Sequence, residues 1–243
     1  FVAGASGDPS KLIVGGYVMV GAILTNASPV SLADVTPIAR LTGEAEAIAV
    51  PVGSPIQTIG DLVELLKADP GAVSWAGGSA GGVDHITVGL LAKAAGVDPT
   101  KVNYVAFSGG GEALAAILGN QVTAGISSVS EFQAQADAGT MRILAVSTAE
   151  RWPSTDAPTL KESGIDVDVL NWRMVAAAPG LSDEQKAAVA ADIDKLANSE
   201  GWKSALATKG WANTYLTGAD FDAQLAKEIE ATTAVLKEIG LVQ

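Results

Sequence analysis

The residues best suited to chemistry in this chain are a glycine-rich loop with one serine and a histidine close behind it. The loop spans Gly77–Gly82, with Ser79 inside it and His85 after it. A short strand, Val73–Ala76, precedes the loop, and apolar residues recur at helical spacing from Val83. The first N–H groups of such a helix lack partners, and the helix dipole adds partial positive charge there. The loop therefore predicts a site for a carboxylate or phosphate, although a tight strand-to-helix turn needs no ligand.

The same loop also fits an enzyme hypothesis. Gly77-x-Ser79-x-Gly81 has the spacing of the nucleophile elbow of α/β-hydrolases, between a strand and a helix. The triad of those enzymes needs a later histidine, yet the only histidine is His85, on the helix that follows the loop. Asp84 and His85 fit either an acid–base pair or a structural, hydrogen-bonding role. An α/β-hydrolase-type enzyme that uses Ser79 is the alternative to a binding protein, and a ligand sensor is a third hypothesis.

Two further strand–loop–helix units follow the first one. The strand Val102–Phe107 leads into Ser108–Gly111, and the strand Val122–Ile126 leads into Ser127–Ser130. This alternation predicts a parallel sheet with helices on its faces. Ligands of open parallel sheets bind beyond the carboxyl ends of the strands, so we expect the three loops to converge. Glycines and hydroxyl groups without a catalytic pair indicate binding by hydrogen bonds rather than reaction.

The remaining pattern predicts the elements that must position these loops. We expect strands at 12–14, 38–41, 45–50, 142–147 and 174–178, and helices at 61–67, 112–118, 131–138, 160–164, 182–197, 201–209 and 219–239. Proline and glycine near residues 50–54 indicate a first crossing between two lobes, and a return crossing is expected at 171–174. One lobe then comprises residues 1–51 and 172–243, and the other comprises residues 52–171.

Composition narrows the classes of function. The net charge of -12 argues against nucleic acid and against an anionic membrane surface, since both need basic residues. The chain has no cysteine and one histidine, so we expect no metal site and no cofactor. It has no apolar run of about 18 residues that would span a membrane. Its start lacks the basic and apolar regions of a signal peptide.

Several motifs, in order along nearly the whole chain, resemble one protein family. The stretch S-W-A-G-G-S-A-G-G-V-D-H resembles the glycine/serine loop, ending in histidine, of the substrate-binding proteins of tripartite tricarboxylate transporters, the TctC or Bug family. V-A-F-S-G-G-G-E-A-L resembles the second loop of that family. G-T-M-R-I-L-A-V-S-T-A-E-R with A-P-T-L-K-E-S-G, and then N-W-R-M-V-A-A-A-P-G, resemble its later segments.

This resemblance implies a two-lobed periplasmic-binding-protein (Venus-flytrap) fold of the α/β class, with parallel or mixed sheets flanked by helices. It implies a monomeric, periplasmic or otherwise extracytoplasmic protein that captures a small carboxylate between its lobes. The membrane subunits of a tripartite transporter would be its partners. The implied ligand-binding residues are Tyr17, Met19, Gly78, Ser79, Ala80, Gly81, Gly82, His85, Ser108, Gly109, Gly110, Ser127 and Ser128.

The chain departs from the family pattern in two respects. The family usually begins with a further βα unit that carries a Gly-Gly…Asp loop, and we expect this unit to be missing ahead of Phe1. Ser79 and Gly82 are exchanged relative to the usual glycine and serine of the first loop, and Ala106 replaces a proline. These changes concern which carboxylate is bound, and dicarboxylates, tricarboxylates, amino acids and aromatic acids all stay open.

Overall fold

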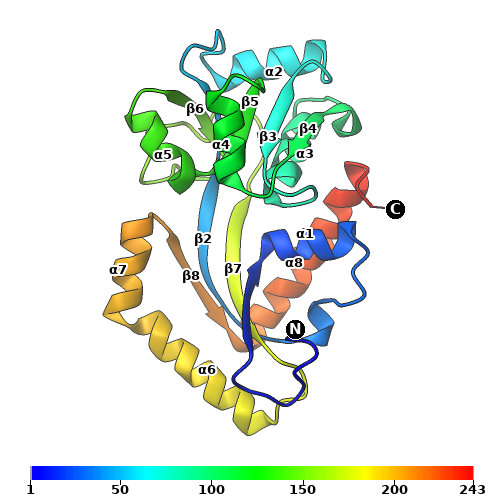
Figure 1. Ribbon diagram of the computed structural model, residues 1–243, viewed down its shortest axis with the longest axis vertical. Helices are drawn as coiled ribbons and strands as arrows, with labels where there is room; N and C mark the ends of the chain where they lie inside the picture. Colours follow the sequence, from blue (N-terminus) through cyan, green and yellow to red (C-terminus); the bar gives the residue numbers. More distant parts are fainter. Residues whose placement is uncertain (1, 243) are drawn as a thin grey trace. The chain divides into compact units, whose positions relative to one another are not determined.

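The computed structural model describes residues 2–242, which form two compact units. Unit 1 comprises Phe1–Glu44 and Trp172–Thr233, and unit 2 comprises Ala45–Asn171 and Ala234–Gln243 (Figure 1). The segments 45–51 and 234–242, which the sequence analysis assigns to the first lobe, belong to unit 2 in this division of the chain.

Unit 1 is built on antiparallel strands. Strand β1 (Leu12–Gly16) pairs with β7 (Leu170–Ala177), β7 lies beside β2 (Thr36–Pro51), and β8 (Ala212–Thr217) pairs with the first part of β2. The buried side chains of β2 and β7 pack with helix α6 into one apolar cluster, which comprises Ile38, Ala39, Leu41, Val175, Ala177, Leu181, Ile193 and Ala197. The helices of this unit are α1 (Tyr17–Thr25), η1 (Leu32–Asp34), α6 (Asp183–Asn198), α7 (Glu200–Lys209) and most of α8 (Gly218–Glu238).

Unit 2 contains the parallel strands that the sequence predicts. Strand β3 (Ser74–Gly77) pairs in parallel with β4 (Asn103–Ala106) on one side and with β5 (Ala124–Ser128) on the other. The second part of β2 pairs antiparallel with β5 and with β6 (Met141–Val146), so the sheet is mixed. The helices are α2 (Ile59–Ala68), α3 (Val83–Ala94), η2 (Pro99–Lys101), α4 (Gly110–Leu118) and α5 (Val129–Asp137).

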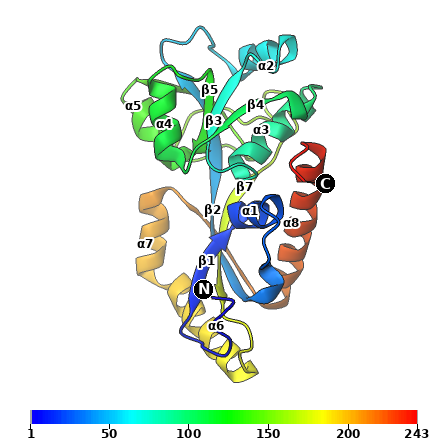
Figure 2. The same cartoon turned by 45° about the vertical axis from the view of Figure 1, so that its right-hand side comes forward.

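Helix α4 shows how the unit 2 sheet is covered. It contacts both β3 and β5, and α5 lies next to it (Figure 2). The close approach depends on Gly125 of β5, because a Cβ at this position would overlap the side chain of Ile117. The small residue lets the helix sit directly on the strand.

Several expected elements differ in the structure. The two strands expected at 38–41 and 45–50 are one continuous strand, β2. Its first half pairs with β8, and its second half pairs with β5 and β6. Residues 160–164 form a turn rather than a helix, and Gly164 ends this turn with a φ of 82°. Strand β8 was not expected, and the third predicted strand extends to Ser128, so Ser127 and Ser128 belong to β5 rather than to a loop.

Candidate functional site

The carboxyl ends of three parallel strands bring the predicted loops of unit 2 to one edge of its sheet. Gly77 of β3 is opposite Ala106 of β4, and β5 runs parallel to β3 on its other side. Each strand is followed by a helix, and the residues that precede α3, α4 and α5 are Gly82, Gly109 and Ser128. The structure therefore supports the predicted convergence of the strand ends.

The helices at this edge differ from α2, α6 and α7 in how they begin, and they share an uncapped start with α1 of unit 1. No side chain caps the N-terminus of α3, α4 or α5. In contrast, Thr58, Ser182 and Ser199 each cap their own helix by accepting a hydrogen bond from its first turn. Uncapped first turns leave N–H groups and the positive end of the helix dipole available to an anion. This edge of the sheet is therefore suited to hold a negatively charged group.

The backbone of the first loop is largely bonded within the protein. The amide of Gly78 donates to Asp84 Oδ2 at 2.6 Å, and the amide of Gly81 donates to His85 Nδ1 at 3.3 Å. The amide of Gly82 donates to the carbonyl of Ser79 at 2.9 Å. Gly81 has a φ of 73°, which favours glycine in this tight turn. Ser79 and Ala80 lie at the exposed tip of the loop.

Tyr104, on β4, contacts this loop and was missed by the sequence analysis. Its hydroxyl donates to the carbonyl of Gly78 at 2.9 Å, and its ring stacks on His85 with 4.0 Å between the ring centres and 3° between the planes. Burial raises the pKa of Tyr104, and the nearby carboxylates of Asp84 and Glu46 add to the effect. Only the register of β3 against β4 brings this tyrosine to the loop, and the sequence carries no signal for it.

His85 is a neutral hydrogen-bond acceptor in this site. Burial lowers its pKa from 6.5 to about 4, so the ring carries no charge at pH 7. Because Nδ1 accepts the Gly81 amide, the ring proton lies on Nε2. The hydrogen-bonding role that the sequence analysis left open for His85 is therefore present in the structure. Among residues 2–242, no hydrogen bond joins Ser79 to His85.

The second and third loops meet through Gly110. A Cβ at Gly110 would overlap Glu131 Oε2 and would lie 2.5 Å from Ser127 Oγ. The Ser127 hydroxyl donates a short hydrogen bond to Glu131 Oε2. The amide of Ser108 donates to Glu112 Oε2 at 3.1 Å, and hydrogen bonds from Ser108 lower the pKa of the Glu112 carboxyl group. Acidic side chains in the first turns of α4 and α5 therefore fix these two loops.

Ser127 and Ser128 are less accessible than the sequence analysis assumes, with exposed fractions of 3% and 7%. The hydroxyl of Ser128 points back into the sheet and donates to Glu46 Oε1 at 3.4 Å. Glu46 is fully buried on β2, and the sequence analysis did not select it. The side chain of Ser128 therefore supports the floor of the site.

The charges around the three loops are all negative. Residues 77–82, 108–111 and 127–130 contain no lysine or arginine. Asp84, Glu112 and Glu131 lie in the first turns of the helices that follow. An anion at these loops would therefore interact with N–H and O–H groups rather than with a positively charged side chain.

Tyr17 and Met19 lie in unit 1, where β1 runs directly into α1 without an intervening turn. The ring of Tyr17 stacks on Trp172 with 6.2 Å between the ring centres, and burial raises its pKa to about 12. Gly16 packs against the carbonyl of Trp172, where a Cβ would not fit. The side chain of Met19 covers Gly15.

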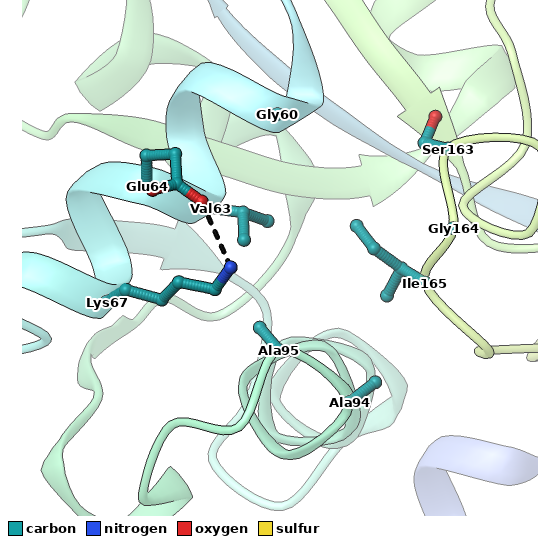
Figure 3. A pocket seen from close by; sticks show the side chains of 9 residues that line it. All are labelled: Gly60, Val63, Glu64, Lys67, Ala94, Ala95, Ser163, Gly164 and Ile165. Atoms are coloured by element: carbon teal, nitrogen blue, oxygen red, sulfur yellow. Dashed lines mark hydrogen bonds and ion pairs between the residues drawn. The ribbon is translucent and has the colours of Figure 1, made fainter.

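A hollow in unit 2 lies away from the predicted loops. It has a volume of about 340 Å³ and is bordered by α2, the C-terminal end of α3 and the turn at 163–165 (Figure 3). Lys67 and Glu64 form an ion pair of 3.0 Å at its rim. None of the predicted site residues lines this hollow.

Two further features bear on the class of protein. Within residues 2–242, no group of histidine, aspartate and glutamate side chains is arranged to hold a metal ion. Of the helices in the described part of the chain, none has the length and apolar character to span a membrane.

Comparison with known proteins decides the family. Residues 19–241 match the profile of the tripartite tricarboxylate transporter family receptor, TctC. The chain belongs to this family. A UPF0065 protein in the gbd 5' region of Cupriavidus necator is 24% identical to it over 215 residues, which cover 86% of this chain and 63% of that protein. The chain therefore spans less than two thirds of the length of this relative.

Solved structures show the same fold. R. palustris Rpa4515, solved with adipate, superposes with a TM-score of 0.87 at 22% identity, over 98% of this chain and 81% of that one. MatC from Rhodopseudomonas palustris, solved with malate, gives a TM-score of 0.72 at 23% identity, over 98% and 79% of the two chains. These findings confirm the predicted TctC family and its two-lobed α/β periplasmic-binding-protein fold, and they do not support the α/β-hydrolase alternative.

Proposed function

We propose that this TctC-family protein is an extracytoplasmic solute receptor that binds a small carboxylate and releases it unchanged to the membrane subunits of a tripartite transporter. The observation that carries the proposal is the set of uncapped N-termini of α3, α4 and α5 at one edge of the unit 2 sheet. Family membership supports it, as does the fold shared with proteins solved with adipate and malate.

In this proposal the carboxylate is bound by hydrogen bonds alone. The exposed loop tip offers the amides of Ser79 and Ala80 and the hydroxyl of Ser79. The Ser108–Gly110 turn offers the amides of Gly109 and Gly110 at the start of α4, since the Ser108 amide already donates to Glu112. Oriented N–H dipoles hold an anion without a positive charge, and no group of the ligand is changed.

The proposal extends to the predicted contacts and crossings that the structure leaves untested. Tyr17 and Met19 are proposed to contact the ligand from unit 1. The proposed hinges are the segments 50–54 and 171–174. Their backbone is proposed to change conformation when the ligand binds. Non-enzymatic action, a periplasmic location and a monomeric state also belong to this proposal.

Binding is tested by thermal shift and titration calorimetry with malate, adipate, citrate and glutamate. A receptor is stabilised by one of these carboxylates, with a single saturable site, because a ligand that binds only the folded state raises apparent stability. The recovered ligand should be chemically unchanged. Steady hydrolysis of an ester substrate by the purified protein would refute the proposal.

Ser79→Ala separates the receptor from the enzyme hypothesis. Loss of one hydrogen-bond partner should weaken carboxylate binding by about 1–3 kcal/mol, or roughly five- to 150-fold in Kd. The matched control is Ser204→Ala, at an exposed position of α7 in unit 1, which should leave Kd unchanged. A hydrolase would instead lose all turnover in the Ser79 variant. Equal Kd values for the two variants would remove Ser79 from the site.

A further inference from the structure

Three side chains hold the backbone of the first loop from two elements. Asp84 and His85, on α3, accept the amides of Gly78 and Gly81. Tyr104, on β4, donates to the carbonyl of Gly78 and stacks on His85. Asp84 is 8% exposed, so its carboxylate is fixed beneath the loop rather than free in solvent. We refer to Asp84, His85 and Tyr104 as the loop clamp.

The loop clamp determines which backbone groups face outward. A trans peptide unit is planar, and its C=O and N–H point in opposite directions. The carbonyl of Gly78 and the amide of Ser79 belong to one such unit, so the Tyr104 hydroxyl that holds this carbonyl also turns the Ser79 N–H away from itself. In the same way, the bond from the Gly82 amide to the Ser79 carbonyl directs the Ala80 N–H outward.

The remaining amides of the loop are already used. Gly78, Gly81 and Gly82 each donate within the protein, whereas no hydrogen bond from the amides of Ser79 and Ala80 is found among residues 2–242. Both of these residues are exposed. The loop therefore presents two N–H groups to solvent and keeps the Gly78 and Ser79 carbonyls, which would repel an anion, turned away.

We propose that Tyr104 is a positioning residue for ligand binding, which fixes the peptide unit between Gly78 and Ser79 so that the Ser79 amide, together with that of Ala80, meets the carboxylate. Asp84 and His85 complete the loop clamp by holding the neighbouring amides. This inference rests on the proposed function. In it, the glycine amides of the loop hold the loop in shape and do not bind the ligand.

The experiment compares wild type with Tyr104→Phe, which keeps the stacked ring and removes only the hydroxyl. Without that hydroxyl the peptide unit is free to turn its carbonyl toward the ligand. The Kd for malate or adipate should then rise by roughly tenfold or more, while the Tm of the free protein changes little. Tyr215→Phe is the matched control, because it removes a hydroxyl that donates to Asp194 at 3.0 Å in unit 1. Its Kd should equal that of wild type.

Amide exchange measured by NMR gives a readout that a general loss of stability would not produce. In the free protein, the amides of Gly78 and Gly81 should exchange slowly, and those of Ser79 and Ala80 should exchange fast. Ligand should protect Ser79 and Ala80 only. Tyr104→Phe should speed exchange at Gly78 by roughly tenfold or more, with no change in the core strand β5.

Failure of this inference is distinguishable from failure of the proposed function. If wild type binds a carboxylate and Tyr104→Phe binds it equally well, the inference is overturned and the function stands. If wild type binds none of the carboxylates, the function fails, and exchange in the free protein decides whether the loop clamp exists. Unchanged exchange at Gly78 in Tyr104→Phe, or new protection of Gly78 and Gly81 on adding ligand, would overturn the inference.

Discussion

At the scale of single residues, His85 makes the stability of the folded protein depend on pH. Its pKa of about 4 in the folded protein lies below the ordinary 6.5, because burial disfavours the charged ring. Below pH 6.5 the unfolded chain therefore binds a proton that the folded protein does not. The stability that His85 supplies is complete above this pH and falls as the pH drops toward 4.

Replacing His85 by phenylalanine tests this linkage. Wild type should lose about 2 kcal/mol more of its free energy of unfolding than His85→Phe between about pH 7.5 and pH 5. The flat ring of phenylalanine keeps the stack on Tyr104, so the comparison isolates the titration. Urea denaturation at each pH measures the difference, and parallel curves for the two proteins would contradict the burial of His85.

At the scale of elements, the start of α4 depends on two neighbouring glycines that differ in their surroundings. A methyl group at Gly110 would meet Glu131 and Ser127, whereas a methyl group at Gly111 would meet nothing within 4 Å. Gly110→Ala should push Glu131 away from Ser127 and weaken carboxylate binding several-fold. Gly111→Ala should leave binding intact and raise stability by about 0.5 kcal/mol, because alanine restricts the unfolded chain. Calorimetry and urea denaturation of the pair measure both effects, and equal loss of binding in both variants would contradict this account of Gly110.

Local signals predicted many elements correctly. The start of α2 carries Thr58 with Asp61 and the start of α6 carries Ser182 with Gln185, which are local helix-start signals, and both pairs form capping boxes in the structure. The apolar runs that became β3, β4 and β5 alternate with helices, which was enough to predict parallel pairing. These features depend on neighbouring residues, so the sequence carries them directly.

Features that depend on distant pairing were not predictable. Strand β8 has a mixed composition and owes its structure to pairing with β2. The Thr42–Ala212 hydrogen bond between these strands joins residues 170 positions apart in the chain. The role of Tyr104 requires the register of β3 against β4, and Glu46 meets Ser128 because the two residues are opposite each other on the neighbouring strands β2 and β5. Sequence patterns predict which segments form strands, and they do not fix which residues become opposite one another.

At the scale of the whole molecule, the chain combines a net charge of -12 with a proposed site for an anion. The loops at the carboxyl ends of β3 and β4 contribute no basic side chain, so the field of the protein as a whole does not attract the ligand. Local N–H dipoles at three helix N-termini act over short distances and are the favourable electrostatic contribution there. The site is therefore expected to select its ligand by short-range hydrogen bonds rather than by long-range attraction of charge.

A crystal structure of the protein with malate or adipate tests this account most directly. We predict a carboxylate whose oxygens lie within hydrogen-bond distance of the Ser79 and Ala80 amides, with the Tyr104 hydroxyl still on the carbonyl of Gly78. A carboxylate bound elsewhere, such as in the hollow beside α2, with the tips of the three loops empty, would contradict it.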